Sequence, residues 1–473
     1  MKKQEHQQLI ATLETIEQAQ KSSMYDVCQE GIEAMLNFIE DISEKTKTSA
    51  LLEEHFELLY KASIGEIGKP LLKNHLSKIK NSIKHELKPT RLEIAFITHK
   101  ASMSDSIESI YLAAKEDPDC DAFWIPVPYY EHNSKGEPEF MRFEGQEFYP
   151  NLPCTPWTEY DIEGRRPDVI FTFSLYDSFN RLSSIHPDFY CQRLRNLTDL
   201  LVSVPYYVDV DDGTADEYWL LPGFLLAHKT ILANERTRSF HVNAYKKEND
   251  IRLGLPEEKF IALGSPKYDK AINTKREDCI LPDKWNKWQN LIADKKVILY
   301  ISSIGPMGET KETYFQKLEY ILNTFHKRDD VVFWWRPHPL FEVTINSAMP
   351  GVLPLYKKIV ELYKGQNWGI YDDTSDLHRA IAWSDGVYGD WSSVLMLCEA
   401  TGKPAMMANT TTRTERLKPG LGDIRCEGAD DTLEKFIDDV KSGSVKREAK
   451  FEGNAGERIY DYAKRVVLGG VRG

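Results

Sequence analysis

Short apolar runs that end in small or polar residues alternate with amphipathic stretches through most of this chain. Residues 92–97 form one such run, and a helical pattern over 103–115 separates it from the next run at 122–127. This β-α-β order predicts two parallel strands joined by a right-handed crossover. Because the alternation continues to about residue 407, we expect an α/β fold with doubly wound parallel sheets.

Two successive sets of strands can be distinguished. The first set is expected at 92–97, 122–127, 168–173, 200–204, 230–233 and 260–264. A charged, Trp-containing stretch at 283–295 is expected to link it to the second set. That set is expected at 296–301, 331–335, 368–371, 386–388 and 405–407, with the last strand closing the sheet. Two parallel α/β domains in succession are typical of nucleotide-handling proteins.

The residues before about 88 follow a different pattern. Apolar residues such as Ile32, Met35 and Ile39 recur at steps of three and four, which predicts helices. Gly65 and the segment 68–70 interrupt the pattern, so short antiparallel helices are favoured over one long coiled coil. The expected domains are a helical region over 1–88, a first Rossmann-like (acceptor) domain over 89–282 and a second Rossmann-like (nucleotide donor) domain over 283–473.

The composition excludes several classes of function. A formal net charge of -13 argues against nucleic-acid binding through a basic surface. No apolar run has the length of a membrane span, and the first residues lack the apolar core of a secretory signal. Seven cysteines without a CxxC pair indicate neither a zinc site nor a disulfide framework. We expect a cytoplasmic protein without metal or cofactor, and peripheral contact with the inner face of the membrane is left as an alternative.

A segment near the C-terminus has the features of an anion-binding site. Asp390-Trp391-Ser392-Ser393 follows a short apolar run and precedes an apolar helical stretch. Serine is a favoured N-cap, and the first N–H groups of a helix attract an anion because they lack internal partners. Ser392 and Ser393 are therefore candidate diphosphate contacts, and Glu399 further along the helix is a candidate to accept ribose hydroxyls. The structural alternatives are a plain N-cap and a solvated glutamate.

A second segment, Arg336-Pro337-His338-Pro339, follows the apolar run 331–335. Its two prolines stiffen the strand exit. Arg336 offers a bidentate fork for phosphate, and His338 can donate to a phosphate oxygen or protonate a leaving group. Ser302 and Ser303 end another strand of the same sheet and are weaker candidates for nucleotide binding. A purely structural histidine between prolines is the alternative.

The first domain offers two candidates for a general base. His99 follows the first strand, and Asp209 lies after the strand expected at 200–204. Asp209, Asp211 and Asp212 resemble a metal-binding pattern, but no further ligand cluster accompanies them. We therefore interpret these aspartates as a loop and predict no metal site.

With these residues, the chain resembles the CDP-glycerol glycerophosphotransferase family, the teichoic acid primases and polymerases of GT-B fold. The resemblance spans about residues 90–410 and is clearest in the segments 336–339 and 390–393. Gly264-Ser265-Pro266-Lys267-Tyr268-Asp269 also looks like the family's Gly-x-Pro-x-x-Asp element. The resemblance implies two Rossmann-like domains facing a cleft, and it assigns the diphosphate contacts to Arg336, His338, Ser392 and Ser393.

One family element has no counterpart in this chain. The family's Trp-His-Gly-Thr-Pro sequence, whose histidine is the proposed base, is replaced by Val204-Pro205-Tyr206-Tyr207-Val208-Asp209. If the resemblance holds, the base is therefore another residue, with His99 and Asp209 as candidates.

The resemblance implies a metal-independent transferase. It would move glycerol phosphate, or another polyol phosphate, from a CDP-activated donor to a cell-envelope polymer or a polyprenyl-linked acceptor, with CDP-glycerol as the preferred donor. Sugar-nucleotide glycosyltransferases and 2-epimerases share the fold, and a phosphate site does not reveal what is attached to the phosphate. A non-catalytic GT-B-like scaffold, whose N-terminal helices recruit a partner, is the alternative from another class.

Overall fold

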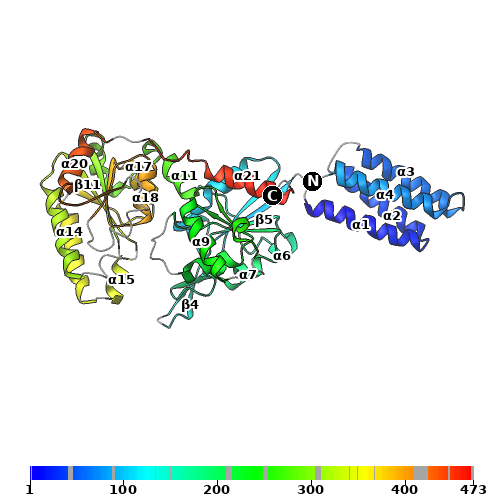
Figure 1. Cartoon of the computed structure of the whole chain (residues 1–473), viewed down its shortest axis with the longest axis horizontal. Helices are drawn as coiled ribbons and strands as arrows, with labels where there is room; N and C mark the ends of the chain where they lie inside the picture. The colour runs from blue at the N-terminus through cyan, green and yellow to red at the C-terminus, as the bar shows by residue number, and fades with distance from the viewer. Residues whose placement is uncertain are drawn as a thin grey trace.

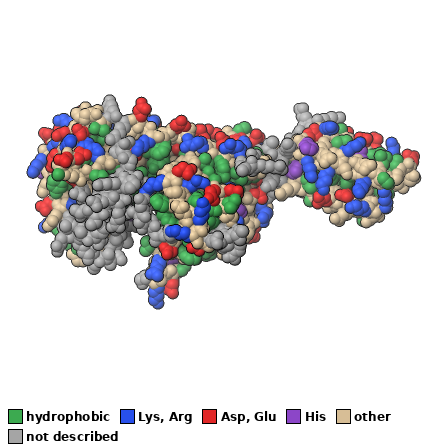
Figure 2. Space-filling model, in the orientation of Figure 1, with side chains coloured by type: hydrophobic (Ala, Val, Ile, Leu, Met, Phe, Trp, Pro, Cys, Tyr) green, Lys and Arg blue, Asp and Glu red, His purple; other side chains and the backbone are tan. Residues whose placement is uncertain are grey.

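The computed structural model of the chain describes most of its residues. They are residues 1, 3–40, 46–87, 91–133, 135–149, 151–208, 216–248, 254–303, 311–339, 341–348, 350–366, 368–408, 424–445 and 448–469. Figure 1 shows a helical bundle at one end of the molecule, one α/β domain in the middle and a second at the other end. On the face shown in Figure 2, acidic and basic side chains are interspersed over the described parts.

Four helices form the N-terminal bundle. They are α1 (Lys3–Lys21), α2 (Tyr25–Glu40), α3 (Lys47–Ser63) and α4 (Lys69–Glu86). Their apolar faces meet in one core that buries Leu13, Ile32 and Leu52. Thr46 caps α3 through a capping box with Ser49, which satisfies N–H groups that the helix itself leaves unpaired. The expected helical region before the α/β domains is confirmed.

The first α/β domain contains a six-stranded parallel sheet in the order β2-β1-β5-β7-β8-β9. β1 is buried along its whole length, because both faces of the sheet are covered. Phe96 packs in the cluster under α5 (Glu108–Glu116), whereas Ile97 faces the opposite cluster, which includes α7 (Cys191–Leu194). The strands are β1 (Leu92–Thr98), β2 (Cys120–Pro126), β5 (Val169–Thr172), β7 (Leu200–Ser203), β8 (Lys229–Leu232) and β9 (Phe260–Ala262).

Two features of this domain differ from the expected pattern. The helix expected over 103–115 begins as a 3-10 turn, η1 (Ala101–Ser106), and continues as α5. Strands β3 (Tyr129–His132), β4 (Pro138–Arg142) and β6 (Ser183–Ile185) form an antiparallel sheet that the sequence did not predict. All of β4 is exposed, so no alternation of buried and exposed side chains marks it in the sequence.

The second α/β domain contains a parallel sheet in the order β12-β11-β10-β13-β14-β15. Helices α14 (Lys311–His326) and α16 (Leu353–Gln366) cover one face, and α17 (Leu377–Trp383) and α18 (Ser393–Ala400) cover the other. The strand expected to close the sheet is followed by one more, so that expectation is corrected. The strands are β10 (Lys296–Ser302), β11 (Val331–Pro337), β12 (Gly369–Tyr371), β13 (Gly386–Gly389), β14 (Ala405–Met407) and β15 (Arg425–Cys426).

The last helix, α21 (Ala455–Val467), returns to the first α/β domain (Figure 1). Its Ile459 and Ala463 are buried in the same cluster as Phe96. This helix lies in the range expected for the second domain, yet it covers the first sheet. Its amphipathic pattern predicts a helix but does not indicate which of two similar sheets it covers.

Buried Asp269 fixes the start of α21. Its carboxylate accepts hydrogen bonds from the N–H groups of Ala455 at 2.9 Å and Gly456 at 2.7 Å, and from the Ser109 hydroxyl at 2.8 Å. An added Cβ at Gly456 would lie 2.4 Å from the carbonyl carbon of Ser109, so glycine permits the close approach to α5. The carboxylate complements the helix dipole as well as its unpaired N–H groups.

We predict that Asp269→Ala lowers the free energy of unfolding by about 3 kcal/mol, because three hydrogen bonds to a buried carboxylate are lost together. Urea denaturation measures this change, and hydrogen exchange should show loss of protection in α21. Asp461→Ala, which removes an exposed acid from the same helix, should change stability by less than about 0.5 kcal/mol. Equal stability of the two variants would show that Asp269 does not anchor the helix.

Candidate functional site

Both parallel sheets have a point at which the strand order reverses, and open α/β sheets bind ligands outside the carboxyl ends of the strands at such points. In the second sheet the reversal lies between β10 and β13. Residues 302–303 end there and 390–393 follow β13. In the first sheet it lies between β1 and β5, which are followed by His99-Lys100 and by 173–177. Ser303, Ser392 and His99 therefore lie where the topology predicts a ligand.

The register of the second sheet aligns the ends of three strands. Ile301 of β10 pairs with Arg336 of β11 on one side and with Gly389 of β13 on the other. An added Cβ at Gly389 would lie 2.3 Å from the Ile301 carbonyl oxygen, so this close pairing requires glycine. With adjacent strands about 4.8 Å apart, Arg336 and the segment after Gly389 are separated by roughly 10 Å. The two predicted segments thus flank the end of β10.

Arg336 is 7% exposed and is held by a buried carboxylate. Its Nη1 donates to Asp372 Oδ2 at 2.7 Å. Asp372 also accepts hydrogen bonds from Trp334 Nε1 and from the backbone and hydroxyl of Thr374. Asp372 therefore fixes the guanidinium at the sheet edge. Sequence analysis missed this residue, although its place directly after an apolar run is the same signal that identified Arg336.

His338 follows Arg336 at the exit of β11. Its backbone N–H donates to the carbonyl of Ser302 at 2.9 Å, which extends the pairing of β10 and β11 past the strand end. Part of the residue is open to solvent, while the surrounding protein desolvates the imidazole and lowers its pKa below the usual value of 6.5. The ring is therefore neutral at pH 7 in the free protein. A neutral imidazole can donate a hydrogen bond to a phosphate oxygen through one of its nitrogens.

The two serines at the end of β10 have different environments. Ser302 is fully buried, and its hydroxyl accepts a hydrogen bond from Trp335 Nε1 at 3.1 Å. Its side chain is thus engaged in the core, and we leave it out of the proposed contacts. Ser303 is only partly buried, and its backbone N–H donates to Asp390 Oδ2 at 2.8 Å.

Asp390, at the start of the second predicted segment, is a buried carboxylate with a defined structural role. Its side chain is 0% exposed, and besides the Ser303 N–H it pairs with the Lys317 ammonium of α14. Its backbone N–H donates to the Ile301 carbonyl at 3.0 Å. Asp390 therefore ties the loop after β13 to the end of β10 and to α14. Lys317 lies on a helix far from the motif in sequence, and no sequence signal identified it.

Ser392 and Ser393 begin α18. Ser392 occupies the N-cap position with an extended backbone, but its side chain makes no capping hydrogen bond. Its Oγ is buried and has no partner among the residues that the structure describes. An unpaired buried hydroxyl is unfavourable unless a ligand satisfies it. Together with the first N–H groups of α18, this hydroxyl forms an arrangement suited to an anion at the switch point.

Glu399 lies in the last turn of α18. It is 4% exposed and forms an ion pair with Lys450, a residue of the chain that leads back toward α21. A ribose hydroxyl would have to share this carboxylate with the lysine. The expected ribose contact therefore stays a prediction.

His99, the first-domain candidate, is enclosed between the rings of Tyr129 and Phe173, whose centroids lie 6.1 and 4.9 Å from its own. Its Nδ1 is buried without a hydrogen-bond partner in the described part of the chain. Burial and the neighbouring Lys100 lower its pKa to about 3. His99 is thus a neutral imidazole and a weak base. Asp209, the other candidate base, lies outside the described residues.

A buried cluster connects the two α/β domains near these sites. Asp105 of η1 accepts a hydrogen bond from Lys267 Nζ at 2.5 Å, and its other oxygen contacts His378 Nε2 of α17 at 2.8 Å. All three side chains are at most 10% exposed. The lysine and the histidine hold the pKa of the Asp105 carboxyl well below its usual range, although burial alone would raise it. This cluster fixes the segment after β1 against the second domain.

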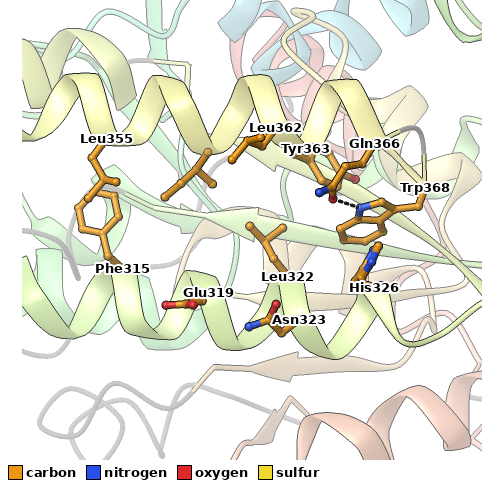
Figure 3. A pocket seen from close by; sticks show the side chains of 11 residues that line it. Phe315, Glu319, Leu322, Asn323, His326, Leu355, Leu362, Tyr363, Gln366 and Trp368 are labelled. Atoms are coloured by element: carbon orange, nitrogen blue, oxygen red, sulfur yellow. Dashed lines mark hydrogen bonds between the residues drawn. The ribbon is translucent and has the colours of Figure 1, made fainter.

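The structure also contains an apolar pocket of about 420 Å³ between α14 and α16. Figure 3 shows Phe315 and Leu322 of α14 facing Leu355 and Leu362 of α16, with Trp368 at one end. None of the predicted site residues lines it. We therefore do not connect this pocket with the candidate site.

The described residues include neither a membrane-spanning helix nor a cluster of metal ligands. No described helix is long and apolar enough to cross a membrane. Within the same residues, no group of three or more His, Cys, Asp or Glu side chains is placed to hold a metal ion.

Comparisons with known proteins identify the fold. No protein-family model and no curated protein matches the sequence. The UDP-GlcNAc 2-epimerase of Methanocaldococcus jannaschii is similar in structure, with a TM-score of 0.51 and 13% identity over 78% of this chain and 99% of that one. A second UDP-N-acetylglucosamine 2-epimerase has a TM-score of 0.50 and 14% identity over 81% of this chain and 98% of its own.

The wall teichoic acid polymerase TagF also matches, with a TM-score of 0.43 and 14% identity over 91% of this chain and all of that one. At these identities the epimerase likeness shows the fold alone. The chain therefore has a GT-B-like fold, with two Rossmann-like domains preceded by a helical region.

We predict that Lys317→Met lowers the free energy of unfolding by about 3–5 kcal/mol, because it leaves the buried Asp390 carboxylate without its cation. Adding Asp390→Asn to this variant should restore part of the loss, since the unpaired charge is then gone. Urea denaturation of the two single variants and the double variant measures the coupling. Lys327→Met, at an exposed lysine beyond the same helix, is the control. Additive effects of Lys317→Met and Asp390→Asn would contradict the ion pair.

Proposed function

We propose that this protein is a transferase that moves glycerol phosphate, or another polyol phosphate, from a CDP-activated donor to a cell-envelope polymer or a polyprenyl-linked acceptor. One observation supports this proposal most directly. The arginine segment and the serine segment, which resemble the donor motifs of CDP-glycerol glycerophosphotransferases, flank the end of β10 in one sheet, and the Ser392 hydroxyl is buried without a partner among the described residues.

The donor diphosphate would lie across the end of β10. On one side, Arg336 would contact it with a guanidinium that Asp372 holds in place. On the other side, Ser392 Oγ and the first N–H groups of α18 would donate to it. His338 would donate from its imidazole, and we keep Glu399 as the candidate ribose contact. Charge that develops on the leaving phosphate is then met by donors that are already in position.

The reaction would be a substitution at phosphorus. An acceptor hydroxyl oxygen forms a bond to the phosphorus that carries glycerol, and the bond from that phosphorus to the bridging oxygen breaks. CMP leaves with the electron pair, and the acceptor proton passes to a base. His99, with a pKa of about 3, can orient a hydroxyl through Nδ1 but holds a proton poorly. Asp209 therefore stays in the proposal as the second candidate base.

Nucleotide selectivity tests this function against its rivals. Thermal shift and isothermal titration with CDP-glycerol, CDP, UDP and UDP-GlcNAc should show stabilisation by the cytidine compounds. Transfer to an envelope-polymer acceptor should then release CMP. Stabilisation by the uridine compounds alone would overturn the CDP donor and favour a sugar-nucleotide enzyme. Absence of binding by every nucleotide would favour the non-catalytic scaffold.

We predict that Ser392→Ala weakens CDP-glycerol binding about 10- to 100-fold, the loss expected for one hydrogen bond to a charged group. Because Ser392 Oγ has no partner in the described part of the chain, the free energy of unfolding should change by less than about 0.5 kcal/mol. Titration calorimetry and urea denaturation measure the two effects. Ser442→Ala, at an exposed serine of α20 (Leu433–Ser442), is the control. Full affinity in Ser392→Ala would remove this hydroxyl from the site.

We predict that His338 takes up a proton when the donor binds. Burial lowers its pKa in the free protein, and a bound diphosphate would raise it again. The CDP-glycerol affinity should therefore increase as the pH falls from about 8 toward 6, and it should level off below the pKa of the free protein.

In His338→Ala this pH dependence should disappear and turnover should be lost, while circular dichroism shows an intact fold. His85→Ala, which removes an exposed histidine of the N-terminal bundle, should keep the wild-type profile. Retained turnover or an unchanged pH profile in His338→Ala would exclude this role.

A further inference from the structure

A second pocket, of about 60 Å³, lies at the switch point of the first sheet. Its lining comes from the segments that follow β1, β5 and β7 and from the edge strand β6. It is therefore the first-domain counterpart of the place where the second domain carries the donor motifs. Its polar lining includes His99, Lys100, Tyr176, Asp177, Ser183 and Tyr206.

Lys100 is the cation of this pocket. Its Nζ donates to Ser183 Oγ at 3.1 Å and lies 4.9 Å from the centroid of the Tyr129 ring. Within the described part of the chain, no carboxylate lies within ion-pair distance of this ammonium. Glu144 and Glu131 act on it only through their fields, and desolvation lowers the pKa of Lys100. A half-buried lysine without a counter-ion is unfavourable, and a bound anion would relieve it.

The one acid that lines the pocket is already engaged. Both carboxylate oxygens of Asp177 accept the N–H of Cys191, at 3.1 and 3.0 Å. The residue is 5% exposed, and its φ of 47° is in the left-handed region that a non-glycine residue adopts only when the surroundings enforce it. Burial raises the pKa of Asp177 to about 6, so the carboxyl is still mostly ionised at pH 7 and both of its oxygens are engaged by the Cys191 N–H. Asp177 therefore shapes the pocket through its bonds to Cys191, and Lys100 is the cation among the described residues that line it.

The other polar groups complete a site with several donors. The hydroxyls of Tyr176 and Tyr206 lie 3.3 Å apart, and Ser183 already contacts Lys100. His99 contributes a buried Nδ1 that has no partner among the described residues. One ammonium, several hydroxyls and a neutral imidazole suit a group that carries both negative charge and hydroxyls. A purely apolar ligand would leave these groups unsatisfied.

We propose that this pocket is a subsite for a phosphate ester. Lys100 is the counter-ion of the phosphate, and Ser183 and His99 form hydrogen bonds with the hydroxyl groups of the ester. That the ester belongs to the acceptor rests on the proposed transferase function. The acceptor would then be a chain that ends in a polyol phosphate, and the subsite would select it over a neutral sugar or polyol end.

Binding of small probes tests this subsite apart from catalysis. Titration calorimetry on the full chain should show binding of glycerol 3-phosphate, weaker binding of inorganic phosphate and no competition by glycerol. Lys100→Met should weaken glycerol 3-phosphate binding at least 10-fold, and Lys100→Arg should weaken it less. Lys115→Met, which removes an exposed lysine lying over Tyr111 in the same domain, should bind like wild type. Thermal unfolding shows whether each variant is folded. If Lys100→Met does not fold, Ser183→Ala replaces it in the test, and it should weaken glycerol 3-phosphate binding about threefold.

Three outcomes would overturn the proposal. The first is that glycerol 3-phosphate does not bind to the wild type. The second is that the Lys100 and Ser183 variants bind it with wild-type affinity. The third is that inorganic phosphate binds more tightly than the ester. CDP-glycerol binding, measured in parallel, should not change in Lys100→Met. If CDP-glycerol does not bind while glycerol 3-phosphate binds through Lys100, the proposed transferase fails and the phosphate-ester subsite stands.

Discussion

The ion pair between Lys317 and the buried Asp390 is the interaction on which the candidate donor site depends. Asp390 accepts the N–H of Ser303 at the end of β10, and it is itself the first residue after β13. One carboxylate thus positions both strand ends at the switch point. Asp372 has the matching role on the other side, where it holds Arg336 at the exit of β11. Because a buried carboxylate is tolerated only with a cation and hydrogen bonds, these two residues restrict the edge to one geometry.

The first domain builds its switch point with different chemistry. There the segments after β1 and β5 and strand β6 supply hydroxyls, a neutral histidine and an ammonium that has no carboxylate partner among the described residues. The second domain supplies a paired guanidinium, a helix start and a hydroxyl that has no partner among the same residues. The cluster of Asp105, Lys267 and His378 joins the loop after β1 to α17, so the two switch points are held in one arrangement. Two residues of the Gly-x-Pro-x-x-Asp element have structural contacts. Lys267 belongs to this cluster, and Asp269 anchors the start of α21. The element that resembles a family motif is therefore structural in this chain.

Most of the fold could be predicted from the sequence, because buried parallel strands and amphipathic helices leave strong periodic signals. β4 could not, since all of its side chains are exposed, and the destination of α21 depends on a contact with Asp269 that is distant in sequence. Within the candidate site, Arg336, Ser392 and Ser393 follow strands and were predicted from that position. Lys317 and Asp105 were not predicted, because each acts through a partner on another element. Ser302 shows the limit of prediction by position, because this strand-end serine accepts a hydrogen bond from Trp335 in the core.

Protonation gives the two switch points a common feature. His338 and His99 both lie beside places proposed for anions, and desolvation lowers the pKa of each imidazole. In the free protein neither ring therefore adds a positive charge near Arg336 or Lys100. A bound anion raises the pKa of a neighbouring imidazole, so part of the charge needed to hold a phosphate arises only when the phosphate is present. This effect is weaker for His99, whose pKa of about 3 lies further from neutrality. In the proposed transferase, His338 is then the residue that would respond to the donor, while His99 would keep a lone pair for an acceptor hydroxyl.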